Sequence, residues 1–214
     1  MFRFAPEGYP YIAFFGIVAI IAFMAGGAWT ALLPFILTLF MLYFFRDPER
    51  DVPEGEGIFV APADGKVILI SKIPGDSLPS LISEDSRGHV MISIFMSPLD
   101  VHVNRSPCDG VVESVLHTPG RFISAFKPEA STQNENIAMV LSTKYGRVLV
   151  RQVAGFIARR AVCRVKAGDA LKGGGRYGVI KFSSRVDIYL PEGARVMVGI
   201  NDRVKAGETV IGRI

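Results

Sequence analysis

Few residues in this sequence could do acid–base or nucleophilic chemistry, and two places stand out. The chain has three histidines, and His102 lies in the polar turn FMSPLDVHVNR, just past an expected strand at 90–96. Turns at strand ends often hold functional residues, and a histidine of near-neutral pKa can carry a proton. Ser183 and Ser184 interrupt the strand-like run KFSSRVDIYLP. They are either two polar residues within a strand or a reactive pair.

The other reactive residue types are less informative on their own. Asp64, in PADG, has the position of an aspartate that starts a turn. His117 precedes Thr-Pro-Gly and can line a turn. Cys108 and Cys163 have neither CxxC nor histidine spacing, so the sequence predicts no metal site and no disulfide framework. Two such cysteines agree with a reducing compartment.

The sequence predicts that the elements positioning these residues are mostly β-strands. Apolar alternation between Gly- and Pro-containing turns is typical of β structure. Segment 153–160 reads as a short helix or a continued strand. The expected strands are 65–73, 90–96, 110–117, 137–143, 147–153, 161–165, 177–189 and 195–198.

One internal repeat refines the expected fold class. RVKAGD at 164–169 returns as RVKAGE at 203–208, each at the end of a strand. Two similar hairpin entries predict a mainly β fold, a pseudo-symmetric sandwich or small barrel of the lipoyl/biotinyl type. The alternative is repeated use of one favourable turn, since six residues are too few to establish a duplication.

The N-terminal region carries a membrane signal. No charged residue lies between Glu7 and Arg46, and this run is nearly twice the roughly 20 residues that a spanning helix needs. Gly26-Gly27 divides it, which predicts a helical hairpin that crosses or re-enters the bilayer. Arg3 before the run and arginines after it place both ends in the cytoplasm. A cleaved signal peptide is the alternative, but cleavage after the first apolar run would leave a second one.

Charge and composition define the rest of the organisation. A polar linker at 46–57 follows the hairpin, so we expect an anchor and linker at 1–50 and a β domain at 51–214. The net charge is +4 without a Lys/Arg run of the nucleic-acid-binding type. Beside a membrane anchor, such an excess suits an anionic lipid surface.

Taken in order, these segments resemble the short bacterial and archaeal form of the phosphatidylserine decarboxylase family. Each motif is weak alone, but their order and number are strongly specific, and they cover nearly the whole chain. The motifs are a hydrophobic hairpin ending in FFRDPER, then APADGKV, FMSPLDVHVNR, HTPGRF, NEN, AGFIARR and YGVIKFSSRVDIYLP.

The resemblance gives the two serines a role. It implies that the Ser184 hydroxyl attacks the preceding carbonyl and that elimination of the resulting ester cuts the chain between Ser183 and Ser184. The dehydroalanine left behind hydrolyses to a pyruvoyl cofactor. The products would be a membrane-bound β chain, 1–183, and an α chain, 184–214, that stay together.

The resemblance also implies the reaction and its partners. The pyruvoyl group would form a Schiff base with phosphatidylserine and serve as electron sink, so that CO₂ leaves and phosphatidylethanolamine remains. The substrate, the membrane and the two chains of the protein itself are the expected partners, with no nucleic acid, and homo-oligomerisation stays open. The expected location is the cell inner membrane, with the catalytic domain on the cytoplasmic face.

Further site residues follow by position. His102 matches the histidine that handles the substrate proton, and Asp64 matches the aspartate that assists self-cleavage. Longer members carry a second histidine where this chain has Arg105, so the base that activates Ser184 could be His102 or His117. Ser183 stands where the family pattern has glycine, and a β-carbon there would slow or block self-cleavage if the backbone is left-handed.

Two other classes of function remain. A non-enzymatic membrane adaptor with a lipoyl-like domain would need no self-cleavage, and Lys66 is poorly placed for a lipoyl-carrying lysine. A serine hydrolase could use Ser184 and His102, but the sequence lacks a GxSxG elbow. A split chain would separate the decarboxylase from both.

Overall fold

The computed structural model describes residues 3–83, 88–126, 129–155, 161–181 and 184–214. The chain forms two compact units, residues 1–49 and 50–214. Each unit is described by itself.

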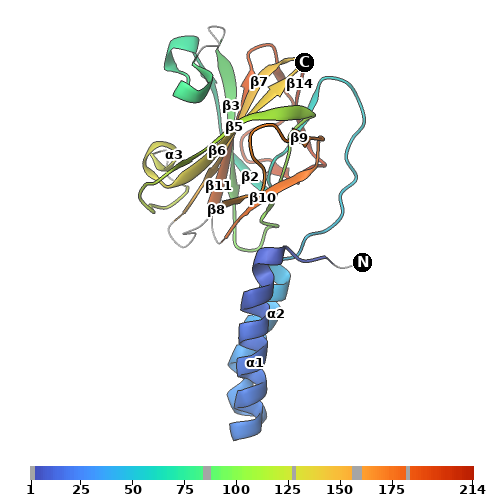
Figure 1. The fold of residues 1–214 in the computed structure, drawn as a ribbon, viewed down its shortest axis with the longest axis vertical. Helices are drawn as coiled ribbons and strands as arrows, with labels where there is room; N and C mark the ends of the chain where they lie inside the picture. Colours follow the sequence, from blue (N-terminus) through green and yellow to red (C-terminus); the bar gives the residue numbers. More distant parts are fainter. Residues whose placement is uncertain (1–2, 84–87, 127–128, 156–160, 182–183) are drawn as a thin grey trace. The chain divides into compact units, whose positions relative to one another are not determined.

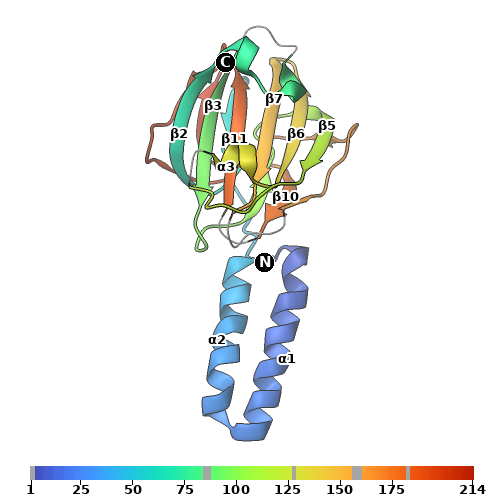
Figure 2. The ribbon, with the colours of Figure 1, turned by 90° about the vertical axis from the view of Figure 1, so that its left-hand side faces the viewer.

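The N-terminal unit is a helical hairpin, as the sequence predicts. A short 3₁₀ turn, Pro6–Gly8, leads into α1 (Tyr9–Gly26), and α2 (Ala28–Phe44) returns antiparallel beside it (Figure 2). Gly27 makes the reversal with φ of 76°, a left-handed conformation that favours glycine. Backbone bonds from Ala5 to Phe45 and from Asp47 to Arg3 close the base of the hairpin.

The hairpin is apolar on its outer surface. Trp29 is 88% exposed and Met24 is 81% exposed. By length and composition, the helical stretch Pro6–Gly26 could cross a membrane, and Ala28–Phe44 is a shorter apolar helix. An exposed surface of this kind indicates an apolar environment rather than water.

The second unit is mainly β, which confirms the predicted class. Among the described residues, an eight-stranded sheet has the order β13-β2-β3-β11-β7-β6-β5-β9, and two three-stranded sheets have the orders β1-β14-β12 and β4-β10-β8. The large sheet curls into a half-barrel (Figure 1). Its strands are β2 (Gly65–Ile73), β3 (His89–Met96), β5 (Gly110–Thr118), β6 (Asn136–Thr143), β7 (Gly146–Val153), β9 (Ala170–Leu171), β11 (Ser184–Pro191) and β13 (Arg203–Val204).

The two small sheets are built from short strands. They are β1 (Ile58–Val60), β14 (Val210–Arg213) and β12 (Arg195–Val196), and β4 (Val103–Arg105), β10 (Arg176–Ile180) and β8 (Ala161–Cys163). The described part of this unit also contains three short helical turns: η2 (Gly75–Ser77), η3 (Ser80–Ile82) and α3 (Ala130–Gln133).

The main hydrophobic core joins the large sheet to both small sheets. It includes Ile94 of β3 and Val186 of β11, together with Phe59 of β1 and Tyr177 of β10. A second cluster packs on alternate residues of the same large sheet, such as Met91 and Tyr189, together with Ile82. Since alternate residues of a strand point to opposite faces, both faces of β11 are covered.

The sequence predicts one strand at 177–189, and this is wrong. Residues 176–180 form β10 of a small sheet, whereas Ser184 begins β11 in the centre of the large sheet, between β3 and β7 (Figure 2). The two strands pair with different partners, so the chain changes sheets between them. The segment predicted as a helix or a continued strand at 153–160 lies mostly outside the described residues.

The repeated hexapeptide forms the same tight turn twice. Asp169 donates its backbone N–H to the Lys166 carbonyl, and Glu208 does the same to Lys205. The glycines Gly168 and Gly207 have φ of 93° and 77°. This similarity is local to the turn, and the pseudo-symmetric arrangement stays a prediction.

Candidate active site

Ser184 is the first residue of β11 and is completely buried. It lies opposite Met96, the last residue of β3. The Ser184 hydroxyl donates to the Met96 sulfur at 3.4 Å. A thioether is a weak acceptor, so this contact holds the hydroxyl loosely. Ser183, the other serine of the predicted pair, lies outside the described residues.

A chain of buried amides leads away from Met96. The Asn104 amide donates to the Met96 sulfur (3.8 Å), and its oxygen accepts from Nε2 of Gln152 at 2.8 Å. Within the described part of the chain, Oε1 of Gln152 is buried without a hydrogen-bond partner. A β-carbon at Gly178 would lie 2.9 Å from Gln152 Nε2 and 2.4 Å from the Val162 carbonyl oxygen, so β10 approaches this amide as only glycine allows.

His102 is buried two residues before Asn104. Its Nδ1 lies 2.9 Å from the Asp100 carbonyl oxygen, which accepts from the ring when Nδ1 carries the proton. A neutral ring in that tautomer has its lone pair on Nε2. The His102 carbonyl accepts the N–H of Ile180 at 3.2 Å, which ties the histidine segment to the end of β10.

Asp64 is held by three hydrogen bonds. Nη2 of Arg50 donates to both carboxylate oxygens, at 3.0 and 2.7 Å, and the Ala206 N–H donates to Oδ1 at 2.8 Å. Burial nevertheless raises the pKa of Asp64, and the Asp100 carboxylate adds a smaller rise, although Arg50 and Ala206 oppose them. Asp100 therefore affects both predicted residues. Its backbone carbonyl is a hydrogen-bond partner of the His102 ring, and its carboxylate raises the pKa of Asp64.

The turn after Asp64 is fixed by glycine. Gly65 has φ of 153°, and a β-carbon there would lie 2.1 Å from the carbonyl oxygen of Phe95. This close approach brings the start of β2 against the end of β3. It explains why the PADG sequence ends in glycine directly beside a predicted site residue.

The other predicted candidate for the base, His117, lies elsewhere, and so does Arg105, which replaces the second histidine of longer members. His117 is on β5 and forms an ion pair with Glu135 at 3.2 Å, with its side chain 54% exposed. Three strand spacings separate β5 from β11, which amounts to about 14 Å. Arg105 is buried, and its Nη1 donates to the Gly174 carbonyl at 2.9 Å. The geometry therefore favours His102 among the predicted bases.

The opposite face of β11 carries a buried charged network. Arg185 forms an ion pair with Asp187 and donates from Nη2 to the Ser93 hydroxyl at 2.8 Å. The Ser131 hydroxyl, from α3, donates to the other Asp187 oxygen at 2.7 Å. These bonds join the start of β11 to β3 and to α3.

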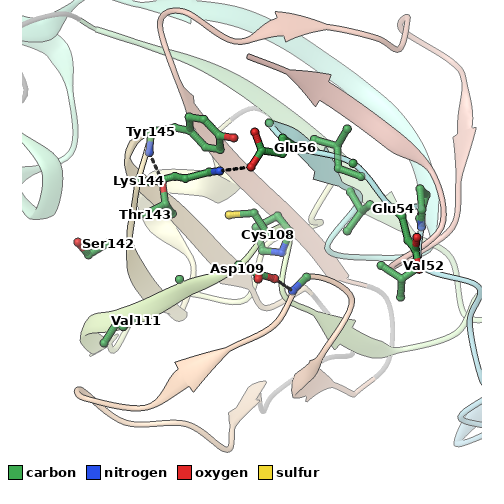
Figure 3. A pocket seen from close by; sticks show the side chains of 18 residues that line it. Val52, Glu54, Glu56, Cys108, Asp109, Val111, Ser142, Thr143, Lys144 and Tyr145 are labelled. Carbon is green, nitrogen blue, oxygen red and sulfur yellow. Dashed lines mark hydrogen bonds and ion pairs between the residues drawn. The ribbon is translucent and has the colours of Figure 1, made fainter.

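The structure also has a pocket of about 630 Å³ at a different place (Figure 3). Residues of the linker and of the turns at 107–111 and 142–145 line it, and none of the predicted site residues is among them. A Lys144–Glu56 ion pair of 3.0 Å crosses it. Burial raises the pKa of the Cys108 thiol to about 12, so this cysteine is a poor nucleophile at neutral pH.

Comparison with known proteins decides the family. A family model for phosphatidylserine decarboxylase matches residues 37–212. The chain belongs to the phosphatidylserine decarboxylase family. Curated relatives named phosphatidylserine decarboxylase proenzyme include those of Syntrophus aciditrophicus (43% identical over 210 residues, 97% of this chain and 96% of the relative) and Geobacter sp. (45% over 216 residues, 97% and 95%). The Nitrosomonas europaea relative is 44% identical over 210 residues, covering 97% and 93%.

Several residues beside the predicted site residues were given no role by the sequence. Arg50, Met96 and Asn104 lie inside the motifs RDPER and FMSPLDVHVNR, which carry the family resemblance but assign them no role. Gln152 lies in a strand with no local signal, and its place beside Asn104 depends on tertiary packing alone.

Proposed function

We propose that this chain is a proenzyme that cuts itself at Ser184 and then decarboxylates phosphatidylserine to phosphatidylethanolamine. The observation that carries the proposal is the placement of Ser184. Its hydroxyl is buried at the beginning of a central strand, beside the Met96–Asn104–Gln152 polar chain, and His102 lies two residues before Asn104. A structural serine would not explain why two further amides gather there.

The proposed self-cleavage uses the chain's own atoms and one water. The Ser184 oxygen bonds to the carbonyl carbon of Ser183 while the peptide C–N bond breaks, and the proton moves to the freed amine. Removal of the Ser184 α-proton then expels the Ser183 carboxylate and leaves dehydroalanine. Its imine tautomer takes up water and releases ammonia, which leaves the pyruvoyl group on Arg185.

The sheet would keep both products together. The strand Ser184–Pro191 pairs with β3 along its whole length and with β7 from Arg185 to Tyr189. Those pairings need no intact peptide at Ser184. The new chain end would therefore stay where the serine was.

The surroundings of Ser184 fit a small carbonyl group. When present, a pyruvoyl group supplies the electron sink that amino-acid decarboxylation requires. Asn104 offers amide N–H groups, and the buried Oε1 of Gln152 offers an acceptor that suits a substrate N–H. These two amides would orient a polar headgroup without carrying charge.

His102 would deliver the proton to the substrate carbon. The Asp100 carbonyl at 2.9 Å from Nδ1 stabilises a ring protonated there, so Nε2 is the atom that would exchange a proton. Asp64, with its raised pKa, would assist self-cleavage.

The apolar hairpin would hold the protein in the cell inner membrane, with residues 50–214 on the cytoplasmic face. The exposed apolar surface of α1 and α2 and the arginines at both ends of the hairpin support this location. The lipid substrate resides in the same membrane, so the anchor would keep enzyme and substrate together.

Intact mass of the purified protein tests the proposal. The small chain should begin with a pyruvoyl group followed by Arg185, and Ser184→Ala should remain a single chain. Ser183→Gly should process faster than the natural chain. A small chain longer by one serine would move the chemistry to Ser183. A chain that stays intact even as Ser183→Gly would instead favour the membrane-adaptor alternative.

A further inference from the structure

Two large apolar side chains lie exposed near Ser184. Leu99 is 63% exposed in the turn that follows β3, and Phe126 is also 63% exposed. The Phe126 ring packs edge-on against Phe95 at a centroid distance of 5.7 Å. Phe95 directly precedes Met96, the residue opposite Ser184. Both exposed side chains therefore lie at the end of β3 that carries the candidate site, with Phe126 on the face of the sheet opposite Ser184.

Cationic side chains lie next to this apolar pair. Lys66 is exposed and pairs in register with both Phe95 and Arg203. Within the described part of the chain, Lys66 has no acidic partner. The Arg203 side chain is 75% exposed and reaches Asp100 at 3.4 Å, whereas the Asp100 side chain is only 15% exposed. The exposed side chains in register with Phe95, Lys66 and Arg203, are therefore both positive.

A short segment of chain connects the hairpin to the second unit. Arg50 is fixed to Asp64 by its side chain, and Asp64 lies two residues before Lys66. Six residue steps separate Arg50 from Phe44, the last residue of α2. Such a segment can span at most about 20 Å even when fully extended. The segment between α2 and the second unit is therefore short, and Arg50, which binds Asp64, is the first residue after it.

We propose that Lys66, Leu99, Phe126 and Arg203, together called the docking edge, rest on an anionic phospholipid bilayer. This inference depends on the proposed membrane location of the hairpin. Leu99 and Phe126 would enter the interfacial region, as leucine and phenylalanine do in interfacial segments. Lys66 and Arg203 would meet lipid phosphates, where each cation contributes to attraction. A substrate headgroup would then reach Ser184 from the bilayer surface around the end of β3, without leaving the membrane.

Fluorescence of the full-length chain tests the contact directly. Trp29 is the chain's single tryptophan, so Trp29→Phe with Leu99→Trp places one reporter on the docking edge. In vesicles of phosphatidylcholine and phosphatidylglycerol, its emission should shift to the blue and be quenched by lipids brominated near the headgroup. The matched control is Val111→Trp, a 47% exposed position on β5, which should show neither effect.

Activity provides the second measurement. Leu99→Asp with Phe126→Asp should lower the rate on phosphatidylserine in vesicles about tenfold, equivalent to ~1.4 kcal/mol. The rate on a soluble short-chain phosphatidylserine should change far less. Lys66→Gln should lower the vesicle rate about fivefold in the presence of phosphatidylglycerol. Intact mass confirms that each variant has processed.

The outcomes separate this inference from the proposed function. Quenching of the Leu99→Trp reporter in a protein without decarboxylase activity would support the docking edge and contradict the proposed function. Normal activity with an unquenched, water-exposed reporter would overturn the docking edge alone. A blue shift that depends on protein concentration and not on brominated lipid would also overturn it, because a second copy of the chain would then cover this surface.

Discussion

At the scale of single residues, the Arg50–Asp64 ion pair opposes the effect of burial on the pKa of Asp64. Burial raises the pKa of this carboxyl, and Arg50 limits the rise. Arg50→Met removes the opposing attraction, so the pKa should rise further and the ionised form should require a higher pH. If self-cleavage uses ionised Asp64, the midpoint of its pH profile should shift upward. Time courses of chain cleavage across pH measure the shift.

Lys144→Met is the matched control for Arg50→Met. Lys144 also forms an ion pair, with Glu56, but its side chain is 62% exposed and lines the pocket away from the site. Its loss should leave the pH midpoint unchanged. A downward shift in Arg50→Met would contradict the assignment, because loss of a cation cannot stabilise a carboxylate.

His102 and His117 offer a matched pair of substitutions. His102→Ala should allow folding but lower the decarboxylation rate of processed enzyme at least about a hundredfold, the usual contribution of a general acid or base. His117→Ala should be close to normal, because that side chain is exposed on β5 and paired with Glu135. CO₂ release measures both rates. A near-normal rate in processed His102→Ala would reject its catalytic role.

At the scale of elements, alanine substitutions at two glycines of positive φ distinguish the cost of backbone strain from the cost of a steric clash. A β-carbon at Gly168 meets nothing within 4 Å, whereas one at Gly65 would lie 2.1 Å from the Phe95 carbonyl oxygen. Gly168→Ala should lower the free energy of unfolding by about 1–2 kcal/mol. Gly65→Ala should lower it by at least ~3 kcal/mol, since strain and clash add. Denaturant titration in the Ser184→Ala background compares them, and equal losses would argue against the tight β2–β3 contact.

The buried pair behind Ser184 leads to another prediction for β11. Asp187→Asn leaves the Arg185 charge buried without its counter-ion, and breaking such a pair costs about 3–5 kcal/mol. The double variant Arg185→Met, Asp187→Leu should recover much of that loss. Unfolding of unprocessed Ser184→Ala protein measures both. A double variant as unstable as the single one would mean that the Ser93 and Ser131 bonds, rather than the charges, stabilise β11.

The same strand shows what the sequence could and could not predict. Long strands such as Gly65–Ile73 have enough alternating residues to be found by pattern. Several strands of two or three residues, such as Ala170–Leu171, carry no usable period and were missed, although Ala161–Cys163 and Arg195–Val196 lie within strands that the sequence predicts. The strand predicted across Ser183 and Ser184 was wrong because local alternation does not reveal which sheet each half joins.

At the scale of the whole molecule, the site depends on contacts that cross the sequence. Motif order was sufficient to select Ser184, His102 and Asp64 as candidates. It could not reveal that Asp100 acts on both His102 and Asp64, or that Gln152 bonds Asn104 across 48 positions of the chain. These tertiary contacts form only when β4, β7, β10 and β11 pack together. Local sequence patterns therefore do not predict them.

The last prediction concerns how the whole protein is retained in the membrane. Salt screens charge interactions but leaves apolar burial intact, so high salt should not release the full-length protein from membranes, whereas detergent should. Ile20→Asp with Leu33→Asp places charges at two exposed positions of the hairpin, and each costs roughly 2.5–3.5 kcal/mol at the centre of a membrane helix. That variant should partition into the soluble fraction after carbonate extraction. Release of the natural chain by high salt alone would show that charge, and not the hairpin, holds it to the membrane.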